Sequence, residues 1–130
     1  MNKNENAINF ASEEENMIVT AWNNGAHSRN GSGYGFKVSV ADRDLHFKPE
    51  WDVIVLELEG QEPFEVNINK EFFWSEACRE LISPEIGKWL RHQGMAPWPM
   101  GNPPHFVVDS LEDNRFSVSK AGKKSGKKPF

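Results

Sequence analysis

Alternation of apolar and polar residues dominates this chain between Met17 and Lys120, and it limits the possible folds more than any other feature. Over about four to eight residues, such alternation is typical of a β-strand that buries one face. The pattern is regular at 34–40, at 52–59 and at 64–69, and a Gly-Gln-Glu-Pro turn separates the last two segments. Sequential short strands joined by short turns favour a barrel or a strongly curved sheet.

Three more strands and two helices complete the expected order. The strands are expected at 17–22, 106–109 and 115–119. Ser75 is expected to act as the N-cap of one short helix that runs through Ile82. The next begins at Ser83-Pro84-Glu85, which supplies a capping hydroxyl, a proline at the first helical position and an acid in the first turn. We therefore predict an α+β, mostly β fold: an antiparallel pseudobarrel of about six to seven strands, with two short helices after the fourth strand.

Composition divides the chain into one domain and two tails. Residues 1–16 are acidic and rich in asparagine, whereas residues 120–130 hold five lysines and no acid. We expect both tails to be disordered and residues 17–119 to form a single domain. The single cysteine, Cys78, cannot form an internal disulfide, and no apolar run has the length of a membrane span. These features predict a cytoplasmic protein with no membrane partner.

No arrangement of residues in the sequence predicts catalysis or a bound metal. No two of the four histidines share a metal-ligand spacing, and no cysteine pair is present for zinc. Asp42-Arg43-Asp44 cannot converge on a cation from an extended chain, so we expect a turn or a short helical cap held by ion pairs. Serine-nucleophile and phosphate-loop motifs are absent. We therefore expect a protein that is not an enzyme and has no cofactor.

The distribution of acids is the main indication of function. The chain has 19 acidic residues and a net charge of −4, yet none lies between Asn16 and Ala41. This window holds a glycine-rich loop with candidate DNA-contacting side chains at Asn23, Asn24, His27, Ser28, Arg29, Asn30 and Ser32. Their polar groups suit phosphates and base edges, and no carboxylate repels the ligand. The alternative is an ordinary solvated hairpin loop, because Gly, Asn and Ser are also common turn residues.

Two further groups of residues extend this pattern. A second acid-free window, Ile86–Val108, contains Lys88 and Arg91. A polar cluster on the non-core face of the strand expected at 64–69, and in the turn after it, consists of Asn67, Asn69 and Lys70. Asparagine reads adenine edges and lysine anchors phosphates. A polar edge strand that resists aggregation is the alternative interpretation of this cluster.

The order of several segments also matches a known family. The polar loop is followed by Gly33–Phe47, Ile54–Leu58, Phe64–Ile68, the aromatic run Phe72–Trp74 and a closing strand, Asn114–Val118. In this order and spacing, the chain resembles the DNA-binding pseudobarrel of the plant B-three transcription-factor domains. The effector-binding domains of EcoRII-type restriction endonucleases share that fold. The resemblance covers roughly Ile18 to Ser119.

This resemblance implies a non-catalytic module that binds double-stranded DNA and reads its sequence or a base modification. Family members grip the major groove with two arms, one before the second strand and one after the fourth. Here the first arm is Asn23–Ser32, and the second arm consists of Asn67, Asn69 and Lys70. Arg29 and the asparagines then contact base edges, whereas the phosphate anchors are Lys37, Lys70, Lys88 and Arg91.

Two other functions are compatible with the sequence. The first is a protein-interaction or inhibitor module, from a mobile element or a defence system. Its low-entropy aromatic surface would comprise Trp51, Trp98 and the proline-rich segment 97–104. The second is a small-ligand or nucleotide pocket that the glycine-rich loop forms at the mouth of the barrel.

Overall fold

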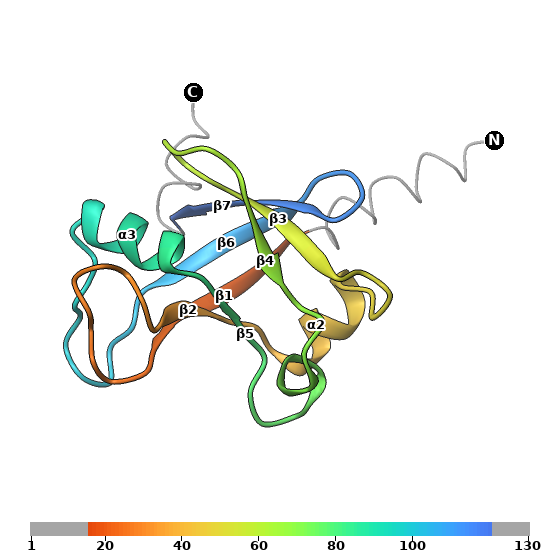
Figure 1. Ribbon diagram of the computed structural model, residues 1–130, viewed down its shortest axis with the longest axis horizontal. Helices are drawn as coiled ribbons and strands as arrows, with labels where there is room; N and C mark the ends of the chain where they lie inside the picture. Colours follow the sequence, from red (N-terminus) through yellow and green to blue (C-terminus); the bar gives the residue numbers. More distant parts are fainter. Residues whose placement is uncertain (1–15, 121–130) are drawn as a thin grey trace.

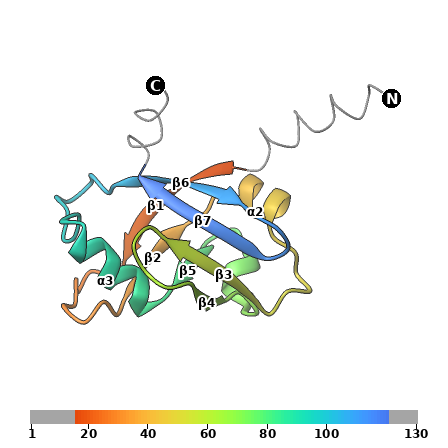
Figure 2. The same ribbon diagram turned by 90° about the horizontal axis from the view of Figure 1, so that it is seen from above.

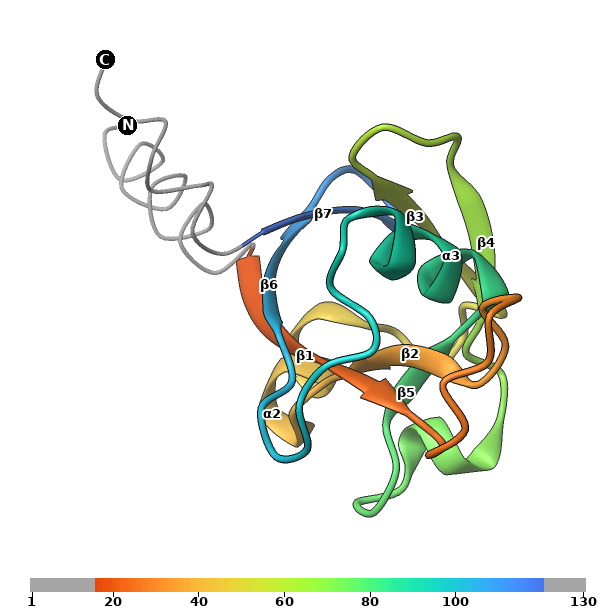
Figure 3. The ribbon, with the colours of Figure 1, turned by 90° about the vertical axis from the view of Figure 1, so that its left-hand side faces the viewer.

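The computed structural model describes residues 16–120, which form a seven-stranded sheet, two α-helices and a 3₁₀ helix. Its strands are β1 (Asn16–Asn23), β2 (Tyr34–Lys37), β3 (Val53–Leu58), β4 (Phe64–Asn67), β5 (Glu80–Ile82), β6 (His105–Ser110) and β7 (Arg115–Lys120). Hydrogen bonds connect them in the order β4-β3-β7-β6-β1-β2-β5. Figure 3 shows the sheet curling round so that its two end strands, β4 and β5, approach each other. The predicted mostly β, barrel-like α+β fold is confirmed.

The expected tails fall almost wholly outside the described residues. Asn16 and Lys120 are the first residue of β1 and the last residue of β7, so the strands reach one residue further than expected at each end. The predictions for residues 1–15 and 121–130 concern parts of the chain that the structure does not describe.

The prediction of a purely antiparallel sheet is wrong at one position. β3 and β7 run parallel, with Leu56 opposite Phe116 and Leu58 opposite Val118. The other five pairings are antiparallel. A parallel pair requires a long crossover connection. Here β4, β5, a helix and β6 all lie between β3 and β7 along the chain, so the connection is long enough.

The two α-helices close opposite ends of the barrel, as Figures 1 and 2 show. α2 (Val40–His46) follows β2, so the prediction that both helices come after the fourth strand is wrong. The expected helical cap at Asp42–Asp44 is confirmed: the Ser39 hydroxyl accepts a hydrogen bond from the Asp42 amide at 3.1 Å, and Arg43 pairs with Asp44 at 3.0 Å. α3 (Pro84–His92) begins as predicted, with the Ser83 hydroxyl accepting from the Glu85 amide.

The helix expected at 75–82 is absent, and this prediction is wrong. A 3₁₀ helix, η1 (Glu71–Trp74), comes first, and β5 then pairs with β2, Leu81 lying opposite Phe36. The Ser75 hydroxyl does accept hydrogen bonds from the amides of Ala77 and Cys78, but these close a turn only. Pairing with the free edge of β2 buries Leu81 almost completely, and this tertiary gain outweighs local helix propensity.

Aromatic side chains fill the barrel and join both helices to it. Phe106 lies 5.3 Å from Phe36 and 5.4 Å from Trp89 of α3, measured between ring centroids. At the other end, Phe47 stacks on Phe116 at 4.9 Å. These contacts fix α3 against the strands that carry the polar loop. Among residues 16–120, no helix has both the length and the apolar character needed to cross a membrane.

Candidate nucleic-acid interface

The two acid-free windows of the sequence lie side by side in the structure. β1 pairs with β2 from its own window and with β6 from the other window. The connector 93–104 also meets β1, because the Ala21 amide donates to the Pro104 carbonyl at 2.9 Å. Figure 1 shows the first arm, the connector and α3 gathered at the same end of the molecule. One continuous region therefore combines segments far apart in the chain, and neither segment contains an acid.

Short internal hydrogen bonds order the first arm. The amide oxygens of Asn23, Asn24 and Asn30 each accept from the backbone amide two residues further on, at 2.5, 3.0 and 2.9 Å. The backbone amide of Asn24 donates to the backbone carbonyl of Gly33 at 2.9 Å, and this hydrogen bond closes the base of the loop. This is the side-chain turn chemistry that favours asparagine in loops. It uses the amide oxygens locally, and the amide nitrogens remain as donors.

The first arm is also pressed directly against α3. Gly31 is buried and has φ +90°, and a Cβ atom there would lie 2.3 Å from the Pro84 carbonyl oxygen. A Cβ atom on Gly87 of α3 would lie 2.3 Å from the Gly31 carbonyl oxygen. Both positions therefore require glycine for steric reasons, and the loop backbone rests on the helix backbone.

Arg91 of α3 holds the tip of this loop. Its Nη2 donates to the His27 carbonyl at 2.5 Å and its Nε donates to the Ser28 carbonyl at 3.2 Å. The guanidinium carbon lies 5.9 Å from the centroid of the Tyr34 ring. The sequence predicted Arg91 as a phosphate anchor. The structure instead directs its donors at the loop backbone, which makes it a positioning residue for the arm.

Three rings join the first arm to the proline-rich connector. Nδ1 of His27 lies 2.7 Å from the Tyr34 hydroxyl oxygen, in a partly buried hydrogen bond. The His27 and Trp98 rings meet edge to face, with centroids 5.1 Å apart, and Trp98 meets Tyr34 at 5.8 Å. His27 has φ +50°, a strained value for this residue that these contacts hold.

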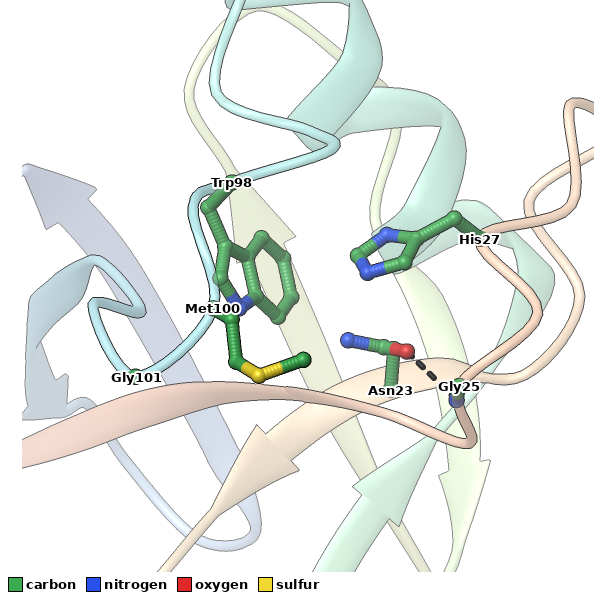
Figure 4. Close-up of a pocket in the computed structure, with 6 residues that line it drawn as sticks. All are labelled: Asn23, Gly25, His27, Trp98, Met100 and Gly101. Atoms are coloured by element: carbon green, nitrogen blue, oxygen red, sulfur yellow. Dashed lines mark hydrogen bonds between the residues drawn. The ribbon is translucent and has the colours of Figure 1, made fainter.

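A pocket of about 500 Å³ opens beside this ring cluster. Its lining residues are Asn23, Gly25, His27, Trp98, Met100 and Gly101. Figure 4 shows Trp98 and Met100 on one side and His27 on the other, with the Asn23 amide between them. The Met100 side chain is almost fully exposed. The volume falls in the range of small-molecule sites, about 300–1,000 Å³.

The second arm does not join this region. The first arm joins β2 at its Tyr34 end. The second arm lies beyond the opposite end of β2, where Lys37 is paired with Glu80, the first residue of β5. The Asn67 side chain accepts from the Asn69 amide at 2.9 Å, and the Asn69 side chain donates to Asp52 at 3.1 Å. β4 is an end strand of the sheet, as the edge-strand interpretation requires.

The remaining predicted cations differ in how they are engaged. Lys37 forms an ion pair with Glu80 at 3.1 Å, and Lys88 forms one with Glu85 at 3.6 Å. Burial lowers the pKa of Lys70, and the charges of Glu80 and Cys78 partly oppose that shift. Within residues 16–120, the Arg29 side chain is exposed and makes neither a hydrogen bond nor an ion pair. Arg29 is therefore the cation of the first arm that is best placed to meet a ligand.

Trp98 and Met100 are pocket residues that sequence reasoning did not assign to the DNA site. Trp98 was assigned with Trp51 to a protein-binding surface, but Trp51 packs on Phe116, which also stacks on Phe47 at the end of α2. Figure 1 shows α2 at the other end of the barrel from the connector. The sequence feature that could have indicated a shared surface of the connector and the loop is the absence of acids from both windows. In the described part of the chain, no group of three His, Cys, Asp or Glu side chains is placed to hold a metal ion.

Comparisons of this chain with protein-family models, with curated proteins and with solved structures found no match.

Proposed function

We propose that this protein is a non-catalytic module that binds double-stranded DNA and reads its sequence or a base modification. One observation carries the proposal. Two acid-free segments far apart in the chain lie side by side, and among residues 16–120 the exposed Arg29 side chain has no hydrogen-bond or ion-pair partner. The two windows supply cations and no acid in a chain of net charge −4; Glu80 and Glu85, which pair with Lys37 and Lys88, come from outside the windows. This local excess of cations favours a polyanionic ligand.

Electrostatics supports this proposal despite the overall negative charge. At physiological salt, charges further apart than about 8 Å are largely screened, so the local face decides the sign of the interaction. Lys37 and Lys88 are paired with Glu80 and Glu85, but both lysine side chains are partly exposed. Glu85 is exposed as well, and an exposed ion pair contributes only about 0–1 kcal/mol, so Lys88 can exchange this partner for a phosphate. Glu80 is buried, so Lys37 remains paired with it when DNA binds.

The order of the first arm supports direct reading of bases. Arg29 offers a bidentate fork for guanine O6 and N7, and the amide nitrogens of Asn24 and Asn30 are donors in the same loop. The loop is already tied to α3 by Arg91, so little conformational entropy is lost on binding. We assign Arg91 to positioning of the arm, with phosphate contact as a secondary role.

The second arm takes a supporting role in this proposal. It follows β4, which contacts β5, and β5 pairs with β2, the strand that follows the first arm. A duplex lying across these strands reaches both arms, and Lys37 of β2 lies between them. Nearby acids, among them Asp52 and Glu80, weaken the second arm as a phosphate site.

Fluorescence anisotropy with labelled duplexes, unmodified and cytosine-modified, tests the proposal at two salt concentrations. Full-length wild type is compared with Arg29→Ala and with Lys48→Ala, a matched loss of one exposed charge beside Trp51. Arg29→Ala is expected to weaken binding by about 1–3 kcal/mol and, for a base contact, to relax preference among duplexes. Lys48→Ala should change neither property. Absence of binding at low salt, or equal effects of the two variants, would refute the proposed function.

A further inference from the structure

The pocket beside the first arm has a chemical character that the arm alone does not explain. Its walls are the indole of Trp98, the thioether of Met100 and the imidazole of His27. No carboxylate lines it. Gly25 and Gly101 border open space, since a Cβ atom at either position would meet nothing within 4 Å. Such walls suit a flat, apolar-faced ring.

The polar groups that face this pocket are hydrogen-bond donors. The Asn23 side-chain oxygen accepts from the Gly25 amide at 2.5 Å, so the amide nitrogen points into the space between the walls (Figure 4). The Tyr34 hydroxyl oxygen lies 2.7 Å from Nδ1 of His27, and in the tautomer in which this hydroxyl donates, the ring proton of His27 is on Nε2. In Figure 4 the other ring nitrogen of His27 faces the Asn23 amide. A ligand with a carbonyl oxygen satisfies both donors.

We infer that this pocket receives a single unpaired nucleobase that carries a carbonyl oxygen, while the first arm holds the adjoining strand. This inference rests on the proposed function, because the arm is what brings DNA to the pocket. Thymine, cytosine and guanine carry the required oxygen, and adenine does not. The His27 and Trp98 rings already touch, with centroids 5.1 Å apart, so the base lies against them, above Asn23.

The test compares four probes on the full-length chain. Three are labelled duplexes: one fully paired, one with a single bulged thymine and one with a single bulged adenine. Both bulged duplexes carry one unpaired base at the same position, so their comparison separates the identity of that base from the presence of a bulge. The fourth probe is thymidine monophosphate alone, measured by thermal shift, which separates a base within a strand from a free nucleotide.

The decisive variant is Asn23→Asp, and Asn30→Asp is its matched control. Aspartate keeps the acceptor for the Gly25 amide, so the turn persists, but it replaces the inward donor with a carboxylate oxygen. Asn30→Asp makes the same charge change in an equivalent turn that does not line the pocket.

Wild type is expected to bind the bulged-thymine duplex about tenfold more tightly than the paired duplex, by stacking of the extra base, with a smaller gain for adenine. Asn23→Asp should lose the thymine gain. Asn30→Asp removes a donor of the first arm and should weaken binding of all three duplexes alike, so the ratio of the bulged-thymine affinity to the paired-duplex affinity should persist. Equal affinity of wild type for all three duplexes, or equal behaviour of the two variants, overturns the inference and leaves the proposed function standing. If no duplex binds, the proposed function fails. In that case, a thermal shift with thymidine monophosphate that Asn23→Asp abolishes supports the pocket as a base site. The absence of such a shift in wild type overturns the inference.

Discussion

Replacing Arg91 by lysine separates two roles that alanine substitution cannot distinguish. Lysine keeps the positive charge that a phosphate anchor needs. It loses the planar fork that donates to the His27 and Ser28 carbonyls together, at 2.5 and 3.2 Å. If Arg91 acts by positioning the first arm, Arg91→Lys should resemble Arg91→Ala in its effect on DNA affinity. If Arg91 acts as a phosphate anchor, Arg91→Lys should resemble wild type.

The contacts of Arg91 give the expected magnitude. A hydrogen bond from a charged donor contributes about 1.5–3 kcal/mol, and the low end applies because the side chain is partly exposed. Lysine forms one such bond at a time and also loses the guanidinium contact with Tyr34, about 0.5 kcal/mol at an exposed site. Arg91→Lys should therefore lower the free energy of unfolding by about 2 kcal/mol. Loosening of the arm should weaken DNA binding by about tenfold, or about 1.4 kcal/mol.

Urea denaturation followed by tryptophan fluorescence gives the stability change, and anisotropy with a labelled duplex gives the affinity. The anisotropy is measured under conditions in which the variants remain folded, so that loss of binding is not loss of fold. Lys88→Arg, a charge-conserving change on the exposed face of the same helix, serves as the control and should leave both quantities unchanged. Wild-type affinity in Arg91→Lys would refute the assignment of Arg91 to the arm.

Three further predictions test the fold around the site. Gly87→Ala should destabilise the protein by about 1 kcal/mol in urea denaturation, because overpacking against Gly31 and Tyr34 exceeds the usual gain of alanine in a helix; an increase in stability would contradict the close packing. Leu81→Ala should cost about 2–5 kcal/mol by the same measurement, since Leu81 is buried in β5; a cost below 1 kcal/mol would contradict that pairing. Lys70 has a pKa lowered from its usual 10.5, so the unfolded state binds its proton more tightly, and stability should rise with pH between the folded and unfolded pKa values. Lys70→Met should therefore be more stable than wild type at neutral pH, with a gain that shrinks toward pH 10.5; a gain independent of pH would contradict the burial effect.

Elements with strong local signals could be predicted from the sequence. Alternation located the strands, and Ser83-Pro84-Glu85 marked the start of α3 because capping depends on adjacent residues. The missing helix at 75–82 shows the limit of such signals. Ser75 has a real capping role, but whether a helix or a turn follows depends on the free edge of β2, which lies about forty residues earlier in the chain. The parallel pairing of β3 with β7 is likewise set by the order of the whole sheet.

In the candidate site too, local features could be predicted from the sequence and contacts between distant segments could not. The position of the polar loop between two strands was predictable, but the use of its groups was not. The amide oxygens of Asn23, Asn24 and Asn30 close turns within the loop, and Arg91 reaches the loop from α3. The spacing of residues does not reveal either contact. The pocket depends on the meeting of His27 with Trp98, which only the packing of the connector determines.

On the proposed function, the acidity of the rest of the chain orients the protein on DNA. All the acids in residues 16–120 lie in the segments 42–85 and 109–113. Glu80 and Glu85 pair with Lys37 and Lys88 of the acid-free windows, whereas the other acids belong to α2, β3, β4, η1, the end of β6 and the loops beside these elements. Within a screening length of about 8 Å, those faces repel phosphates and the acid-free face does not. Productive encounters are then limited to the face that carries Arg29. Removing acids from the remote faces, as in Glu112→Gln, should raise non-specific binding more than specific binding, and the ratio of the two affinities in anisotropy measurements should fall. An unchanged ratio would show that the remote acids do not orient the complex.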